Sequence, residues 1–391
     1  MQFNRLIPRL IIVLLWFLAC AIMSPSEAFS QAGNGIVLRG TVLEYESNEP
    51  MIGVHVFVSG TTIGTATDRD GRFEFRYDNP PLEFDLVASI IGFAVEVSSF
   101  ETVALIGTEI EFVLSPRVYE MGGVVITSTN EAWKENLERF KRLIFSTTEN
   151  GRKSELLNPE VLDFTVDPVT DVLTAMANEP LRVENDALGY RITIHNPHLR
   201  GTEAGLIWGG EMQFEGLTPR NDRQERKWAS ARKTAYGGST KHFLTAVASD
   251  TIYESGFAVY TVPSPGTIVK QRKYRAEISL NPPTEEGEPD PSVLRYFSFP
   301  EVLLVRYDRE RESNRYADHM VLLGMRGAIT PSNMRISRAQ DYQMSWLVLH
   351  SETAMIDHRG IEYGDVAMER FGYWSWERLG EMLPSDFEMD E

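Results

Sequence analysis

Cysteine is almost absent from this chain: Cys20 is the only one among 391 residues. It lies in the N-terminal apolar run, upstream of the signal-peptidase site that we expect between Ser30 and Gln31. Cleavage there leaves a mature chain without cysteine. Disulfide bonds, thiolate metal sites and cysteine nucleophiles are then excluded.

Long hydrophobic runs are also missing. The N-terminal run, residues 10–23, is about 14 residues long, whereas a membrane-spanning helix needs roughly 20. Arg5 and Arg9 precede it and small residues follow it, which is typical of a signal peptide over residues 1–30. We therefore expect an exported protein of the periplasm or outer membrane, with no transmembrane span in the mature chain. Lipid attachment at Cys20 is the alternative, because residues 17–20 resemble a lipobox with one unusual position.

Positive charge is scarce, since 38 Lys and Arg face 56 Asp and Glu, for a net charge of −18. This balance argues against nucleic acid or an anionic membrane face as the main partner. Residues 220–241 are locally basic and include Trp228. We expect a helix there with Trp228 inward and the charges in solvent; a phosphate or nucleic-acid patch is the alternative.

A strand–turn–strand pattern at residues 64–75 is the strongest local signal. Gly64 opens it, Asp68 and Asp70 can bond their own backbone, and Gly71 can adopt positive φ. Phe73 then begins a strand with one buried side. The pattern predicts a β-hairpin. A calcium loop is the alternative for the two aspartates, but the further ligands that such a loop needs are missing.

Short alternating strands separated by glycines and prolines fill residues 36–114 and predict a small antiparallel sandwich. Several motifs carry a resemblance: Gly40-Thr41-Val42, residues 49–54, residues 64–73 and Gly92-Phe93. With these, residues 31–115 resemble the carboxypeptidase-regulatory-like domain common in exported Bacteroidota proteins. The resemblance implies a seven-stranded antiparallel β-sandwich, prealbumin- or immunoglobulin-like, that carries no catalytic residue itself.

Residues 116–130 are expected to be a linker. Residues 119–128 are similar to the stretch that follows the same domain in TonB-dependent outer-membrane receptors. About 260 residues remain after it, too few for a plug and a barrel of 22 strands at about ten residues each. A role as an accessory component of such a transport system stays open.

Residues 131–391 are expected to form a β-rich α+β region, which makes the whole chain mainly β. A helix with Trp133, Leu137, Phe140 and Ile144 on one face opens it, capped by Ser128 and stopped at Asn150-Gly151. Strands follow, then an acidic proline-rich loop at 281–291 and a frayed acidic tail at 386–391. The region resembles an uncharacterised Bacteroidota family through residues 158–159, 180–190, 228–244 and 372–378, which adds architecture and localisation only.

Ser239 and His242 are the candidates for a nucleophile and its base. Residues 237–241 are not the elbow that a serine hydrolase needs, and Ser239 is equally placed to cap a helix. His319 is a further candidate base. Trp374 and Trp376 could stack on a sugar if exposed, but core packing is their more common use.

Histidine pairs raise the possibility of zinc, although none has the spacing of a known ligand set. The pairs are His195 with His198, and His350 with the segment around His358. We expect no metal and no cofactor. The sequence therefore predicts a non-catalytic envelope protein with a structural or docking sandwich and a C-terminal region that binds a protein partner or glycan. The alternative is an unrecognised hydrolase or carboxypeptidase-related enzyme in that region.

Overall fold

The computed structural model describes residues 35–117, 130–268, 276, 278–280, 294–323, 339–364 and 368–389. The expected signal peptide with Cys20, Ser30 and Gln31, the acidic loop at 281–291, the cap Ser128 and most of the linker lie outside the described residues. Within the described ranges, no helix is both long and apolar enough to cross a membrane.

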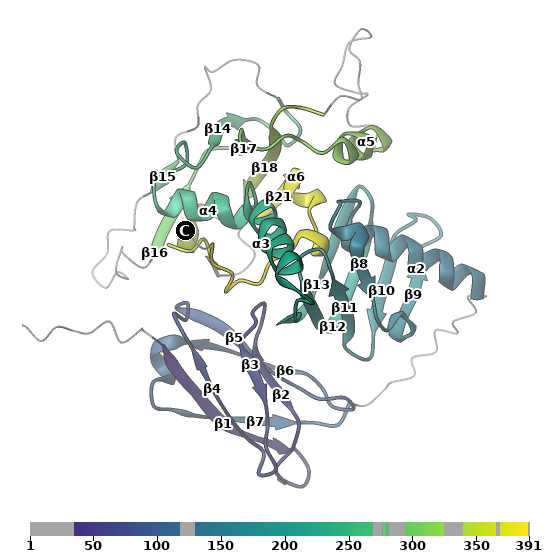
Figure 1. Ribbon diagram of the computed structural model, residues 1–391, viewed down its shortest axis with the longest axis vertical. Coiled ribbons are helices and arrows are strands. Elements are labelled where there is room, and N and C mark those ends of the chain that lie inside the picture. The colour runs from purple at the N-terminus through teal and green to yellow at the C-terminus, as the bar shows by residue number, and fades with distance from the viewer. Residues whose placement is uncertain are drawn as a thin grey trace, which may run out of the picture.

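The N-terminal domain is a sandwich of seven strands in two sheets (Figure 1). One sheet has the order β4 (Arg72–Tyr77), β1 (Ile36–Glu44) and β7 (Glu109–Leu114); the other has β3 (Gly64–Ala66), β2 (His55–Val58), β5 (Glu83–Ser89) and β6 (Glu96–Glu101). A short helical turn, η1 (Thr102–Leu105), follows β6. Alternating apolar residues such as Leu38, Val56 and Phe112 fill the space between the sheets. The expected mainly β sandwich is confirmed, except that β1 and β7 pair in parallel.

The turn at residues 68–71 forms, but the expected hairpin does not. Asp68 Oδ1 accepts hydrogen bonds from the backbone N–H of Asp70 and Arg72, both at 2.9 Å, and Gly71 has a φ of 70°. The strand before the turn, β3, pairs with β2, whereas the strand after it, β4, pairs with β1. The turn therefore carries the chain from one sheet to the other, with Phe73 buried between them.

The first body of the second region is a sheet covered by α2 (Asn130–Phe145). Its order is β8 (Ser154–Leu156), β11 (Leu181–Asn185), β12 (Tyr190–Thr202), β10 (Leu173–Ala177) and β9 (Leu162–Val166), with β13 (Gly205–Gly216) along the other side of β12. The short turn η2 (Gly151–Lys153) lies between α2 and β8, and η3 (Pro159–Val161) joins β8 to β9. Leu137, Phe140 and Ile144 of α2 are buried against the sheet, as their spacing predicted.

The predicted end of this helix is wrong. It ends at Phe145, where Ser146 takes a φ of 64° in the left-handed region. Gly151 belongs to the following turn instead. Phe145 is buried and completes the apolar face of the helix. The chain turns directly after it.

The second body of the region packs two sheets around another core. One sheet is β14 (Phe257–Val262), β17 (Val302–Tyr307), β18 (Gln343–Leu349) and β21 (Met368–Gly372); the other is β15 (Ser279–Leu280), β16 (Leu294–Ser298), β19 (Ala354–Asp357) and β20 (Glu362–Tyr363). Helix α4 (Thr240–Ala248) contributes Phe243 to the same core as Phe257, Phe297 and Leu347. The remaining helical segments are α3 (Asp222–Tyr236), α5 (Asn314–Leu322), α6 (Tyr373–Trp376) and η5 (Leu379–Glu381). The described part of the second region thus has two large hydrophobic cores, and two smaller clusters that include Trp346 and Tyr316.

Candidate ligand-binding site at the domain junction

The β2–β3 turn of the sandwich docks on the edge of β13. Gly60 donates its N–H to Met212 O at 2.7 Å, and Phe214 donates its N–H to Thr61 O at 2.9 Å. Ser59 Oγ also donates to Glu211 Oε2 at 2.6 Å. The sandwich turn therefore forms hydrogen bonds with backbone groups of the edge strand β13. A covalent connection between the domains would not by itself provide these hydrogen bonds.

His195 makes a second contact between the sandwich and the second region. Its Nδ1 lies 2.7 Å from Ser89 Oγ, and the Phe57 ring lies 4.8 Å from the imidazole, centroid to centroid. Burial lowers the pKa of His195 to about 4, so the imidazole is neutral near pH 7. His198, beyond the β-bulge of β12, is exposed. The two rings do not share a metal, and the described parts of the chain hold no group of three residues suited to one.

A buried polar network forms the third contact. Asp357, with a side chain 2% exposed, accepts from Arg359 Nη2 at 2.7 Å and from the Tyr363 hydroxyl at 3.1 Å. The Tyr363 hydroxyl accepts in turn from the Leu82 N–H at 3.2 Å, and Arg359 Nη1 donates to Asn79 O. Burial raises the pKa of Tyr363. The network joins the β19–β20 turn to the β4–β5 loop of the sandwich.

The C-terminal segment, residues 384–389, crosses this junction and ends beside α4 (Figure 1). Ser385 donates its N–H to Gly60 O at 2.8 Å, and Asp386 accepts from the Thr62 N–H at 3.1 Å. Lys241 Nζ donates to the carbonyl oxygens of Ser385 and Phe387, both at 2.7 Å. The expected frayed tail is therefore wrong for residues 386 and 387, which these hydrogen bonds hold in place, whereas Glu388 and Met389 are exposed.

A partly open cavity of about 550 Å³ lies between the two domains at these contacts. It combines residues of the sandwich, α3 and α4, the β19–β20 turn and the C-terminal segment. Tyr77, Asp78, Asn79, Tyr236, Lys241, Thr245, His358, Arg359 and residues 385–389 line it. Ligand sites of 300–1,000 Å³ at domain interfaces are common in proteins. The size and place of this cavity make it the candidate functional site.

Lys241 is the lysine that lines the cavity, and its pKa is shifted by burial. Burial lowers its pKa to about 8, and the carboxylates of Asp386 and Glu388 oppose that change. The side chain is only partly exposed, and its Nζ uses two of its three donors on backbone carbonyls. A cation with a free donor therefore faces the cavity.

Residues 38–126 match the family described as the CarboxypepD_reg-like domain. The N-terminal domain of this chain is a CarboxypepD_reg-like domain. The match ends at residue 126, twelve residues past the end of β7 at Leu114, and does not reach the second region. None of the curated proteins compared with the chain matches it.

Ser239 and His242 lie at the start of α4, outside the CarboxypepD_reg-like domain. Ser239 Oγ accepts from the His242 backbone N–H at 3.1 Å and caps the helix. His242 Nδ1 accepts from the Gly238 N–H at 3.1 Å, and burial lowers the pKa of His242 to about 4. Both groups are used for capping and packing, so they do not form a nucleophile–base pair. His319 lies on a separate helix, α5.

Trp374 and Trp376 are 7% and 3% exposed, which rules out the sugar-stacking alternative for these rings. Trp374 Nε1 donates to Gly238 O at 2.7 Å, and Trp376 Nε1 donates to Thr147 Oγ1 at 3.1 Å. Burying the large apolar area of each ring in the core stabilises the fold more than leaving the ring exposed at the surface, and each indole N–H has a hydrogen-bond partner there. On α3, Trp228 is buried at 3% exposure and the basic side chains of Arg223, Arg226 and Lys227 are exposed.

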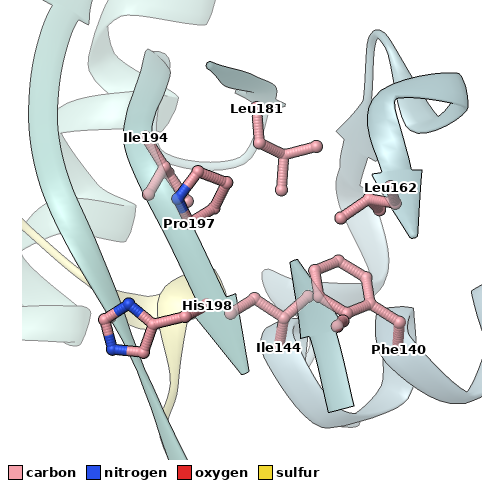
Figure 2. Close-up of a pocket in the computed structure, with 9 residues that line it drawn as sticks. Phe140, Ile144, Leu162, Leu181, Ile194, Pro197 and His198 are labelled. Atoms are coloured by element: carbon pink, nitrogen blue, oxygen red, sulfur yellow. The ribbon is translucent and has the colours of Figure 1, made fainter. Parts of the chain in front are cut away.

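A second, smaller space lies inside the core of the first body (Figure 2). Figure 2 shows Phe140, Leu162, Leu181 and Ile194 around it. Its volume of about 10 Å³ is at the lower limit for one water molecule, and apolar side chains dominate its walls. It is a packing defect and offers no room for a ligand.

No sequence motif marks the residues of the junction cavity. Lys241 carried the one usable signal, because it is the only Lys or Arg of the otherwise apolar α4. Arg359, Asn79 and Asp386 belong to turns and to the C-terminal segment, where charged and amide residues are ordinary.

Proposed function

We propose that this chain is a non-catalytic binding protein of the cell envelope, in which the CarboxypepD_reg-like domain is a structural module. Its second region takes up a glycan or a segment of a partner protein in the junction cavity. The observation that carries this proposal is the cavity itself, since its walls come from both domains and the sandwich is needed to close it.

The chemistry of the described residues supports binding over catalysis. The serine and histidine that the sequence offers are occupied by capping and packing. The cavity instead holds a half-buried cation, carboxylates and rings, which recognise a ligand without needing a nucleophile. Perturbed groups in a cavity mark functional sites of either kind, and the described part of the chain holds no group of three residues suited to a metal beside Lys241.

Export is part of the proposal and rests on the charged start, apolar run and small residues of positions 1–30. The N-terminal sequence of the protein recovered from cells should begin at Gln31. Retention of the first 30 residues would contradict export by this route. If Cys20 is instead lipidated, the wild-type protein is anchored to the membrane. A Cys20→Ser variant will then be absent from the membrane fraction.

Binding is tested by thermal unfolding of the full chain in the presence of oligosaccharides and short peptides. A ligand at about 100 times its Kd stabilises the folded state by about 2.7 kcal/mol. His358 lines the cavity, is exposed and has no hydrogen-bond partner among the described residues, so His358→Trp fills the cavity without removing a bond. Ser230→Trp adds the same ring on the exposed face of α3 and is the matched control.

A true ligand raises the unfolding temperature of the wild type and of Ser230→Trp, and raises that of His358→Trp much less. If no compound in either class has this effect, or if all three proteins respond equally, the cavity is not a binding site.

A further inference from the structure

We infer that the ligand of the junction cavity is a short peptide that carries both a free carboxylate and a free ammonium group. This inference rests on the proposed function and decides between its two ligand classes. It follows from the placement of charges in the cavity and from the state of the rings that line it.

Lys241 is the cation that recognises the carboxylate. Both of its hydrogen-bond partners are neutral carbonyl oxygens, and it forms no ion pair within the described part of the chain. Its side chain is partly withdrawn from water, where a direct ion pair is worth more than at the surface. The third N–H of Nζ is available to an anionic ligand group.

Arg359 also lines the cavity, but its charge is not available to a ligand. Its guanidinium donates through Nε and Nη2 to the same Asp357 oxygen, at 3.0 and 2.7 Å, so its charge is neutralised inside the protein. It also donates to Asn79 O and holds the wall of the cavity. The net positive charge available to a ligand is therefore that of Lys241.

The opposite charge lies on the C-terminal segment. Asp386 and Glu388 line the cavity, Glu388 is exposed, and neither has a Lys or Arg ion-pair partner among the described residues. Both act on the charge of Lys241 through space, so the two signs lie within electrostatic reach of each other. Asp78, the other lining carboxylate, is already paired with Arg76 at 2.6 Å. A ligand that spans this cavity meets a cation without an ion pair, the exposed Glu388, and Asp386, whose carboxylate also accepts from the Thr62 N–H and Oγ1. This arrangement of charges is complementary to a zwitterion.

The rings argue against a neutral glycan. Sugar recognition by stacking needs an open aromatic face, but Tyr236 packs against His242 at 5.0 Å and against Phe387 at 6.1 Å, centroid to centroid. Tyr77 is 3% exposed and packs edge-on against Phe84 in the sandwich. The cavity therefore recognises its ligand through charged groups.

The test is calorimetric titration of the full chain with trialanine and three blocked forms of it: N-acetylated, C-amidated, and blocked at both ends. Trialanine should bind most tightly. Each single block should weaken binding about tenfold or more, and the doubly blocked peptide should not bind measurably. Equal affinity for all four forms would overturn the inference.

Variants assign the two charges. Lys241→Met should remove the preference for a free carboxylate, whereas Lys241→Arg should keep it, and Glu388→Gln should remove only the preference for a free ammonium. Lys227→Met, on the exposed face of α3, is the control and should change neither. The unfolding temperature of each variant is measured alongside, because Lys241 also holds the C-terminal segment.

The outcomes separate the inference from the proposed function. If neutral oligosaccharides bind in the cavity and trialanine does not, the zwitterion inference fails and the binding function stands. If neither class binds, both fail. If trialanine binds but Lys241→Met and Lys241→Arg behave alike, the assignment of the carboxylate to Lys241 fails.

Discussion

Asp357 holds Arg359 and Tyr363, the two side chains that contact the sandwich at Asn79 and Leu82. One of its oxygens accepts from Arg359 and Tyr363, and the other accepts from the backbone N–H groups of Arg359 and Ile361. Every acceptor position thus has a donor, and the carboxylate is almost fully buried. Such a group stabilises only while its charge partner is present.

Asp357→Asn should therefore lower the free energy of unfolding by about 3 kcal/mol, because it leaves the Arg359 charge uncompensated in a half-buried site. Chemical denaturation monitored by tryptophan fluorescence measures this change. Asp78→Asn breaks an exposed ion pair with Arg76 and is the control, with a much smaller expected loss. Equal losses of unfolding free energy in the two variants would show that the buried network contributes no more to stability than the exposed ion pair.

Glu310 predicts a loss of stability at higher pH. Burial, and next to it the charge of Glu381, raise the pKa of Glu310 to about 7 from an ordinary value of 4.5. Between these values the folded state binds more protons than the unfolded state. The stabilising contribution is therefore complete below about pH 4.5 and is lost as pH rises through 7. The pKa of Glu377 and that of Glu381 are raised as well, chiefly by burial.

Glu310→Gln should flatten the dependence of the unfolding free energy on pH between 6.5 and 7.5 and should stabilise the protein at pH 7.5. The gain should be about 1 kcal/mol, because solvent screens a half-buried carboxyl. His195 and His242, with pKa values of about 4, contribute little slope in this window. Denaturation curves at several pH values measure the effect, and parallel curves for wild type and variant would contradict it.

At the scale of elements, the sequence identified strands better than their partners. Alternation at Val54, Val56 and Val58, and again at Ile110, Phe112 and Leu114, marked residues that are buried in the sandwich. The turn at residues 68–71 was also visible, through Asp68 and Gly71. The pairing was wrong because a tight turn and an inward Phe73 are compatible with a hairpin and with a crossing between sheets. Only the long-range partners β1 and β2 distinguish the two.

The turn between β11 and β12 depends on Gly189. Its φ is 73°, and an added Cβ would lie 2.4 Å from the Trp228 ring, so any larger residue is strained and displaces α3. Gly189→Ala should destabilise the protein by about 2 kcal/mol or more. Gly205, between β12 and β13, has open space around its Cβ position and is the control. Thermal unfolding should separate the two variants, and an equal effect would contradict the packing argument.

The cap of α4 separates the two roles considered for Ser239. Ser239→Ala should cost about 1 kcal/mol of stability, and Ser239→Asp should restore most of it, because a carboxylate oxygen can accept from the same helical N–H. An Asp side chain cannot replace a serine nucleophile. Ligand binding that is unchanged in Ser239→Asp therefore fits the capping role, and loss of a measured activity in a well-folded variant would contradict it.

At the scale of the molecule, the candidate site lay beyond sequence reasoning. Its lining comes from residues 77–79, 236–245, 358–359 and 385–389, and no local spacing links these segments. The docking of the sandwich on β13 was equally hidden, since backbone groups make that contact. The sandwich and the first body of the second region each bury apolar residues of their own, whereas polar contacts between them leave no period in the sequence.

The junction contacts predict that the sandwich stays bound when the chain is cut. A protease site inserted within residues 118–129 and cleaved after folding should leave two fragments that co-elute on size exclusion at micromolar concentration. Backbone hydrogen bonds to β13, the buried His195 and the Asp357 network hold the fragments without the linker. Adding Asp357→Asn should shift the cut protein toward separate fragments while the uncut variant still elutes as one species. If the cut wild type separates at once, the linker and not the interface holds the domains together, and the cavity between them is not a stable binding site.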